Sequence, residues 1–578
     1  MKGLRSFGTV VAFVGVAAGC RATDDLFCSK GGCEWTSQEW SNLQTLSPLP
    51  DPPPDPSNKY VGNEAAIALG HELYFDTRFS GNATLLDTLG APVPYARAAS
   101  GQPIKVSCAT CHDPKRAGSD FTSAPNTVSI GAGWYDVNGE QTVNAAHYPL
   151  LYWNGRTDSL WAQAAQVTES GVSVNGSRLN TFWVIENDAH YHAAYDAVFA
   201  DGTNDPLPAT PPSTTDVPLT GKPTAVTAAV NGSWETLTPE NRNMVTRVFV
   251  NYAKAIAAYE YTLASNNSPF DAFIAGDENA ISPAAKRGAR LFVGKASCID
   301  CHNGPLFSDG DFHDIGVPQV GDHVPTVADC YPGRTSCDCT LGDEKSSCMP
   351  SGAWSGALKL SAVPSQDQPP ALATPKTPTE DERKADIAYY NTFRRDSVWS
   401  DGAPDDAYRE KYYKSPKDPT HPRGALLKGA WRTPSLRDVA ITAPYMHNGL
   451  YKTLEDVIWH YDAGLPTGAS SPFAIPVCAT DQMSDPANGA PCAQPGDPMP
   501  VRAVQLRPLG LRDDEVSDLV EFLKTLTRKE LLPDAGGPPP PPPVDAAAVS
   551  DAAPTSDAAP TSDAGVPDGG TPSDGGGQ

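Results

Sequence analysis

Four stretches of the chain carry apolar residues at the spacing of an α-helix. The two shorter ones are residues 63–74 and 283–293. Residues 239–264 form a longer stretch, and residues 512–526 combine an acidic first turn with apolar side chains on one side. The pattern predicts a mainly α-helical protein with little sheet.

Other stretches lack this periodicity. Residues 203–238 and 317–385 are dense in Pro, Thr, Gly and Asp, and we interpret them as insertions. Residues 534–578 contain a run of six prolines and repeated Asp-Ala-Ala-Pro, a composition that cannot offset the entropy lost on folding. They are predicted to be a disordered tail, and the Pro-rich residues 21–59 are predicted to be a linker.

The N-terminus has the order of an export signal. A short basic segment is followed by an apolar run from Val10 to Val16 and then by Ala17-Ala18-Gly19-Cys20. The run is too short to span a bilayer, and small residues precede the cysteine, so residues 1–20 are predicted to be a lipoprotein signal peptide. The expected location is the periplasm, with a lipid anchor on Cys20. A plain secretory signal is the alternative.

Eight of the thirteen cysteines belong neither to this site nor to the two motifs described below. In an oxidising compartment an even number favours disulfides over metal binding. Proximity in the chain favours Cys28 with Cys33 and Cys478 with Cys492. Pairing among the other four is left open; they are Cys330, Cys337, Cys339 and Cys348.

Length and charge limit the class of protein. The 578 residues, 40% of them apolar, suffice for two domains with separate cores. A formal net charge of −25 makes nucleic acid an unexpected partner.

The strongest chemical feature is a pair of motifs, Cys108-Ala-Thr-Cys111-His112 and Cys298-Ile-Asp-Cys301-His302. Their spacing is that of covalent c-type haem attachment, in which both thiols add to the porphyrin and the histidine binds iron. Zinc or disulfides are the alternatives, but both motifs carry the histidine and neither completes a four-cysteine cluster. We therefore predict two cytochrome c-like haem domains, residues 60–238 and 239–530, with irregular, disulfide-stapled insertions.

Four segments along the chain extend this picture. They are Cys108 to Pro114, Ser129-Ile-Gly-Ala-Gly-Trp134, Tyr152 to Leu160, and Arg432 to Gly449. In content and order they resemble bacterial dihaem cytochrome c peroxidases and their MauG branch. The resemblance covers most of residues 60–530 and implies two α-helical cytochrome c-like domains whose haems face a shared interface.

One departure from the family pattern concerns the first haem. Ordinary peroxidases commonly carry a histidine between the glycines of Ser-Ile-Gly-x-Gly-Trp, and it binds iron in the oxidised enzyme; this chain has Ala132 there. A methyl group cannot bind iron. The resemblance therefore implies a first haem held by His112 alone and open to peroxide on its other side, unless an insertion supplies a ligand.

The second haem also departs from the ordinary pattern. The family places its distal ligand seven residues after the leucine of a Leu-Glu-x-x-Val helix, as methionine in ordinary peroxidases and tyrosine in the MauG branch. Here that leucine is Leu454 and the seventh residue is Tyr461. The resemblance therefore implies His302 and Tyr461 as ligands of this iron. A phenolate stabilises high iron valence, which suits a haem that stores an oxidising equivalent. Met446 and His447 are the competing ligands.

The resemblance implies three further roles. Trp153 matches a tryptophan between the haems that can relay electrons. Asn138 matches a ligand of a calcium ion, together with backbone carbonyls near Arg432 and Pro434, and neutral oxygen donors suit this cation. Where relatives carry a catalytic glutamate, this chain has Ser173, so Glu169 becomes the candidate general acid, with a water molecule as the alternative.

Together, the open first haem, Trp153 and Tyr461 favour an enzyme that uses hydrogen peroxide to form a bis-Fe(IV) state. MauG and MbnH of this family modify a residue of a partner protein. The leading interpretation is therefore oxidation of a side chain, with tryptophan favoured, on a periplasmic partner such as a copper-binding protein. The alternatives are a cytochrome c peroxidase supplied with electrons by a small cytochrome or cupredoxin, and a dihaem electron carrier without enzymatic activity.

We expect two haems per chain that stay with the polypeptide in acidified organic solvent, because each is held by thioether bonds. The double variant Cys298→Ala, Cys301→Ala should retain one. Haem absorbance per polypeptide after extraction measures both numbers, and release of haem from the unmodified protein would contradict the assignment.

Overall fold

The structure of the protein is a computed structural model. It describes residues 35–83, 97–120, 129–133, 137–153, 155, 157–171, 173–200, 207, 221–223, 233–313, 315, 317, 392–402, 431–447, 449–463 and 508–531. The predicted signal peptide, tail and disulfides lie outside these residues, as does almost all of the insertion at 317–385. Within the described ranges, no helix is both long enough and apolar enough to cross a membrane.

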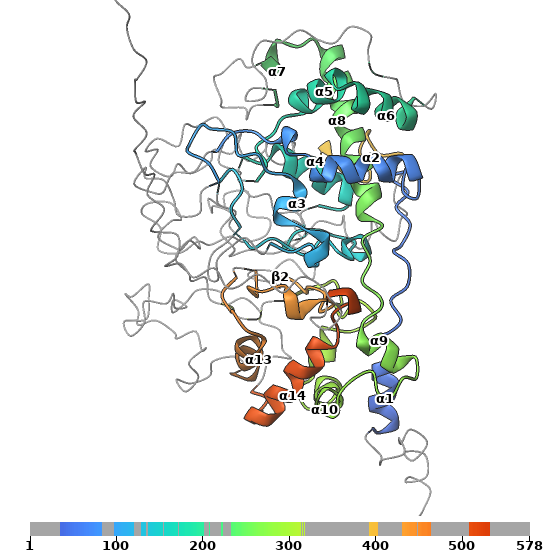
Figure 1. Cartoon of the computed structure of the whole chain (residues 1–578), viewed down its shortest axis with the longest axis vertical. Helices are drawn as coiled ribbons and strands as arrows, with labels where there is room; N and C mark the ends of the chain where they lie inside the picture. The colour runs from blue at the N-terminus through green and yellow to red at the C-terminus, as the bar shows by residue number, and fades with distance from the viewer. Residues whose placement is uncertain are drawn as a thin grey trace, which may run out of the picture. The chain divides into compact units, whose positions relative to one another are not determined.

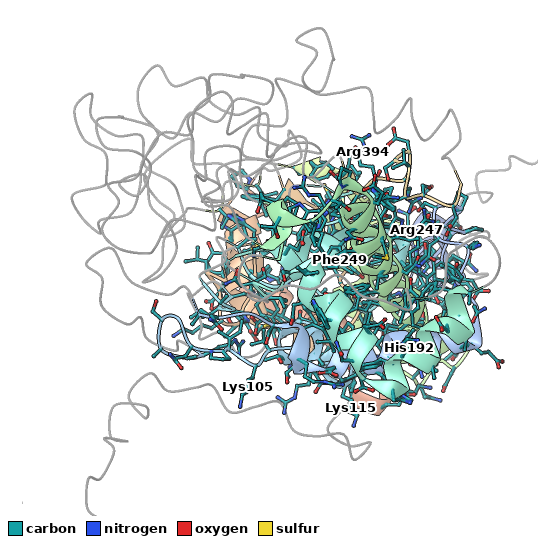
Figure 2. The ribbon with its side chains drawn as sticks, turned by 90° about the horizontal axis from the view of Figure 1, so that it is seen from above. Lys105, Lys115, His192, Arg247, Phe249 and Arg394 are labelled. Carbon is teal, nitrogen blue, oxygen red and sulfur yellow. The ribbon has the colours of Figure 1, made fainter. Side chains whose placement is uncertain are left out.

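Five helices enclose a first hydrophobic core: α2 (Glu64–Phe75), α4 (Leu160–Glu169), α5 (Arg178–Asn187), α6 (Ala189–Phe199) and α8 (Pro239–Glu260). Helix α8 is central, and α2, α4 and α5 all pack against it (Figure 1). Its side chains are buried almost all round from Val245 onward, as expected of a core helix. Phe249 of α8 lies inside this core, whereas Lys105 and Lys115 are exposed at its edge (Figure 2).

A second core contains five other helices: α1 (Ser37–Gln44), α9 (Pro269–Ile274), α10 (Pro283–Val293), α13 (Leu454–Ala463) and α14 (Asp513–Lys524). Helices α10 and α14 form its largest helix pair. A Cβ atom on Gly288 would lie 1.9 Å from the carbonyl oxygen of Asp518, so only glycine permits this close approach.

Short elements complete the described structure. They are α3 (Cys108–Cys111), α7 (Ser233–Thr236), the 3₁₀ helices η2 (Thr77–Phe79), η3 (Pro114–Arg116), η4 (Ala145–His147), η5 (Cys298–Asp300), η8 (Val439–Ile441) and η9 (Lys529–Leu531), and the strands β1 (Phe312–His313) and β2 (Trp431–Arg432). The two strands pair antiparallel, with Phe312 opposite Arg432. The mainly helical fold is confirmed, and the four predicted helices correspond to α2, α8, α10 and α14.

The predicted division of the chain at residues 238 and 239 differs from the packing. Helix α8 follows that division, but its apolar side chains belong to the first core. Phe393, also assigned to the second domain, packs there as well. Sequence periodicity identifies a helix without identifying the core that buries it.

The predicted linker at residues 21–59 also differs from the structure where it is described. Helix α1 begins after an N-cap at Thr36, whose hydroxyl accepts a hydrogen bond from Glu39 N at 3.2 Å. Leu43 and Leu46 are fully buried in the second core. The Pro-rich composition of this segment did not predict that its two leucines would be buried in the core.

A buried guanidinium fixes this N-terminal segment to the rest of the second core. Arg437 is fully buried and donates to both carboxylate oxygens of Asp271, at 2.9 and 3.0 Å. It also donates to the carbonyl oxygens of Pro305, at 2.6 Å, and Leu46, at 3.4 Å. These bonds compensate for burial of the charge and connect segments far apart in the sequence.

Leu43→Ala should destabilise the protein by about 2 to 5 kcal/mol, because it leaves a cavity in a closed core. The exposed neighbour Gln44 provides the matched control, and Gln44→Ala should have little effect. Thermal unfolding followed by circular dichroism compares the two. Equal stability of both variants would restore the interpretation of this segment as a tether.

Candidate functional site

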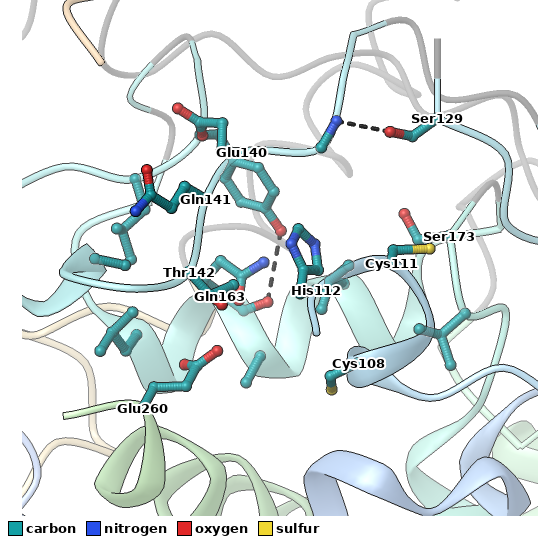
Figure 3. Close-up of a pocket in the computed structure, with 18 of the residues that line it drawn as sticks. Cys108, Cys111, His112, Ser129, Glu140, Gln141, Thr142, Gln163, Ser173 and Glu260 are labelled. Carbon is teal, nitrogen blue, oxygen red and sulfur yellow. Dashed lines mark hydrogen bonds between the residues drawn. The ribbon is translucent and has the colours of Figure 1, made fainter. Parts of the chain in front are cut away.

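The first motif lies at the wall of an apolar cavity. Helix α3 carries Cys108 and Cys111 one turn apart, and His112 follows directly, with its N–H donating to the Cys108 carbonyl at 2.9 Å. All three residues line the cavity, together with residues of α4, α8 and the segment 137–142 (Figure 3). The two thiols and the imidazole therefore face one space, as haem attachment requires.

The His112 imidazole is oriented by the backbone. Its Nδ1 lies 2.8 Å from the carbonyl oxygen of Gly118, a geometry in which Nδ1–H donates and Nε2 keeps its lone pair for iron. Gly118 has a φ of +69°, and a Cβ atom there would lie 2.2 Å from the Thr142 hydroxyl oxygen. The Tyr74 hydroxyl donates to the His112 carbonyl at 2.7 Å. Hydrogen bonds thus fix both the imidazole ring and the backbone of His112.

The second motif repeats this arrangement in a separate cavity. Cys298, Cys301 and His302 line it with residues of α10, α13 and α14. The His302 Nδ1 lies 2.9 Å from the Phe307 carbonyl oxygen, which again leaves Nε2 for iron. Burial lowers the pKa of His302, so the imidazole is neutral and able to bind a metal.

The predicted distal ligand and its competitors converge on this second cavity. Tyr461 lies two turns after Leu454 on α13, and both line the cavity. Removal from water, and then the neighbouring Cys301 and Cys298, raises the pKa of Tyr461 well above its usual range. Met446 and His447 line the same cavity, so the described structure brings all three possible ligands together without selecting one.

Two neighbouring histidines are held in other contacts. His460 is buried, with Nδ1 at 2.9 Å from the Tyr451 hydroxyl and Nε2 at 2.8 Å from the Ile315 carbonyl oxygen. These two contacts of His460 fix the rotation of α13 that directs Tyr461 to the cavity.

The ring of His447 stacks on that of Trp431, with 4.2 Å between the ring centres, and burial lowers the pKa of His447 to about 3.

Trp153 and Arg432 line both cavities. The Trp153 indole N–H donates to the Asn138 carbonyl at 2.9 Å, and the Arg432 N–H donates to the Trp153 carbonyl at 2.8 Å. The structure therefore places Trp153 in a wall common to the two motifs, where the sequence predicted an electron relay.

The residues predicted to bind calcium also meet. Asn138, Arg432 and Pro434 line one further cavity. The Asn138 side-chain oxygen accepts from Gly139 N at 3.0 Å, and its side-chain nitrogen donates to the Pro444 carbonyl at 2.9 Å. Oxygen donors of the required kind are present, although a cation would compete with hydrogen bonds already made.

The first cavity contains a single imidazole. Among the described residues that line it, His112 is the only histidine and there is no methionine. Ala132 is fully buried in a small apolar cluster with Ile104 and Val106, and its N–H donates to the Ser173 carbonyl at 2.7 Å. The described lining thus offers His112 no imidazole or thioether counterpart.

Glu169, the predicted general acid, is directed to a partner outside the first cavity. Its carboxylate accepts from Arg178 Nε at 2.9 Å and Nη2 at 2.7 Å, and both side chains are buried. Glu169 is not among the residues that line the first cavity. The direction of a side chain at the end of α4 depends on the partner that α5 presents, which sequence spacing does not reveal.

Polar groups without partners show where haem carboxylates would fit. The Arg432 guanidinium pairs with Glu140 and lies 3.6 Å from the Tyr148 ring centre, but its Nε and Nη1 have no acceptor among the described residues. The Gln141 side-chain nitrogen, also in the first cavity, lacks one too. Buried donors left unpaired are unfavourable, and the two propionates of a haem would satisfy them. The cavities therefore fit the group that the motifs predict.

The sequence did not identify one further acidic residue. Glu260, the last residue of α8, lines the first cavity. In the sequence, the one feature that could have identified Glu260 is its position as a single carboxylate directly after the apolar run Ala255 to Tyr259. It was missed because the helix pattern does not show which end of α8 reaches the haem motif.

Two haem-binding motifs, each facing its own cavity and sharing a tryptophan in the wall, define a dihaem c-type protein. Comparison with known proteins agrees. Residues 64–279 match the family model described as di-haem cytochrome c peroxidase. Cytochrome-c peroxidase IdrP1 of Denitromonas iodatirespirans is 28% identical over 84% of this chain and 87% of its own. Methylamine utilization protein MauG of Methylorubrum extorquens is 23% identical over 85% and 86%, respectively.

Among solved structures, the chain aligns with a MauG-like protein associated with microbial copper homeostasis. The alignment has a TM-score of 0.46 and 20% identity, and it covers 85% of this chain and 97% of that one. By these matches the chain is a dihaem peroxidase-type oxidoreductase, and it resembles the cytochrome c peroxidase and MauG family. The resemblance inferred from the sequence is confirmed.

Glu169→Ala should destabilise the folded protein by about 3 to 5 kcal/mol, because it leaves the Arg178 cation buried without its partner. Per folded molecule, the ferric haem spectrum and the rate of reaction with peroxide should be unchanged. Denaturant unfolding and stopped-flow absorbance measure the two properties. A normal stability combined with lost peroxide reactivity would return Glu169 to the role of general acid.

Proposed function

We propose that the protein is a MauG-like enzyme that reacts with hydrogen peroxide at its first haem and oxidises a side chain of a partner protein. The oxidising equivalents would be shared between the two haem sites through Trp153. The observation that supports this most directly is that Trp153 lines both cavities. An indole in this position can accept and pass on an electron without moving.

The composition of the first cavity supports peroxide binding there. His112 would hold the iron from one side, and the described lining has no second imidazole or thioether to occupy the other. The lining is largely apolar, with Gln163 and Ser173 among its polar members. Peroxide would therefore need no prior displacement of a protein ligand.

The second cavity would store oxidising equivalents. A phenolate from Tyr461 favours the higher valence of iron, whereas a thioether from Met446 favours the reduced state. Removal from water disfavours the bare phenolate, so the positive charge of ferric iron would be needed to stabilise it. An iron with two protein ligands is suited to electron transfer rather than to peroxide binding.

The substrate in this proposal is a partner protein with an oxidisable side chain, tryptophan being the favoured one. The family resemblance supports such a partner, with a copper-binding protein as one form of it. The N-terminal sequence supports a periplasmic location and a lipid anchor at Cys20. A calcium ion bound near Asn138 and Pro434 would stiffen the wall that contains Trp153.

A second function is favoured by a specific observation. Met446 and His447 line the second cavity beside Tyr461, so an ordinary distal ligand is within the same space. With either of them on the iron, the protein would be a cytochrome c peroxidase that reduces peroxide with electrons from a small cytochrome or cupredoxin. The ligand of the second iron therefore distinguishes the two enzymes.

Tyr461→Phe should change the electron paramagnetic resonance spectrum of the second ferric haem and abolish the near-infrared band expected when both haems share the oxidation by peroxide. Loss of the phenolate raises the potential of that haem, and each ~60 mV corresponds to about tenfold in the equilibrium. Oxidation would then be confined to the first haem or a nearby side chain.

Met446→Leu is the matched control and should leave both spectra unchanged. Trp153→Phe should slow the sharing of oxidation without altering the ligands of either iron. If Met446→Leu, and not Tyr461→Phe, changed the second haem, the ordinary peroxidase would be the better description.

A further inference from the structure

Glu260 carries a buried carboxyl group at the wall of the first haem cavity. Its side chain rises from the end of α8 into the pocket that also contains His112 and Gln163 (Figure 3). The residue is only 4% exposed. Its Oε2 atom has no hydrogen-bond partner among the described residues. An unpaired polar atom at such a place is unfavourable unless a ligand or reactant uses it.

The surroundings keep this carboxyl group protonated. Burial raises the pKa of Glu260 to about 8. The titratable groups that interact with it are Tyr74 of α2, Cys108 of α3 and its neighbour Tyr259. None of the three is a cation, and α4 contributes the neutral Gln163 to the cavity. The uncharged acid is thus the form present at neutral pH.

The other acidic groups of the region are already engaged. Glu169 is held by Arg178, and Glu140, the second carboxylate in the cavity lining, is held by Arg432. Ser173 offers only a hydroxyl group. Glu260 is therefore the one carboxyl group in the described lining that has a proton to give and no cation holding it.

We propose that Glu260 is the residue that donates and accepts protons in the first haem cavity during cleavage of peroxide. This inference rests on the proposed reaction of peroxide at the first haem. It assigns to the end of α8 the role that the resemblance placed near residues 169 to 173.

The chemistry balances with a neutral carboxyl group. The O–O bond breaks with its electron pair on the outer oxygen, which takes the Glu260 proton and leaves as water. The proton of the inner oxygen passes to the other oxygen of the same carboxyl group, which is thereby regenerated. The bound haems would supply the two electrons that reduce the inner oxygen. No net charge is created on Glu260, as suits an apolar cavity.

The test compares Glu260→Gln, which keeps the shape but has no acidic proton, with Glu260→Asp, which keeps the acid. Glu278→Gln, on the exposed surface, is the control. In stopped-flow absorbance, the rate constant for peroxide with the ferric protein should fall by about 10²- to 10⁴-fold in Glu260→Gln. Glu260→Asp should recover part of it, and the control should match the unmodified protein. The ferric spectrum should be the same in all four proteins.

A second measurement does not depend on turnover. Because Glu260 lines the first haem cavity, it should bind its proton more tightly when the haem is reduced, so the potential of the first haem should fall as pH rises through about 8. The limiting slope is about 59 mV per pH unit, the tenfold change in proton activity converted for one electron. Glu260→Gln should remove this dependence.

The outcomes separate the possible failures. An unchanged peroxide rate in Glu260→Gln overturns the proposal, as does a slow variant with an altered ferric spectrum that Glu260→Asp does not rescue. If Glu260→Gln does not take up haem, the unmodified protein decides: a peroxide rate and a potential both independent of pH between 7 and 9 also overturn it. If the potential depends on Glu260 but the ferric protein does not react with peroxide, the proposed function has failed and the proton-transfer role fails with it, while the titration of Glu260 stands.

Discussion

The site depends on one hydrogen-bonded junction between distant parts of the chain. Trp153 donates through its indole to the Asn138 carbonyl at 2.9 Å and accepts through its own carbonyl from Arg432 at 2.8 Å. The Asn138 N–H in turn donates to the His447 carbonyl at 2.6 Å. Because these bonds fix both the side chain and the backbone of Trp153, the indole is held in the wall of both cavities. Without this junction, nothing among these bonds would hold the Trp153 side chain in the wall that the two cavities share.

The histidines of the two motifs are oriented by the same kind of hydrogen bond, and the two sites differ in their surroundings. In both, a backbone carbonyl fixes the histidine Nδ1, at Gly118 for His112 and at Phe307 for His302. The described lining of the first cavity includes Gln163 and Ser173, with His112 as its one histidine. That of the second includes Tyr461, Met446 and His447. The two cavities therefore differ in the side chains they offer beyond the attachment motif.

Four buried ionisable sites of this protein fall into two classes. Arg437 with Asp271 and Arg178 with Glu169 are closed pairs with several hydrogen bonds. The first connects the segment before η8 to α9, and the second connects α5 to α4. Arg432 and Glu260 instead keep unpaired polar atoms beside the first cavity. Closed pairs resist disruption because separation leaves a bare charge, whereas unpaired atoms are suited to binding a cofactor or moving a proton. The division separates residues that stabilise the fold from residues available to the chemistry.

The sequence alone determined what contiguous residues can encode. The two attachment motifs, the four main helices, Ala132 and the spacing of Tyr461 from Leu454 were all readable, because each depends on covalent spacing or helical period. Only the tertiary structure decided where side chains point and what they meet. It assigned α8 to the first core, packed Leu43 into the second, directed Glu169 to Arg178, and placed Glu260 in the lining of the cavity that His112 also lines. Those outcomes depend on partners in other elements, from nine to hundreds of residues away, and no local pattern records such contacts, since burial and pairing arise only when separate elements pack together.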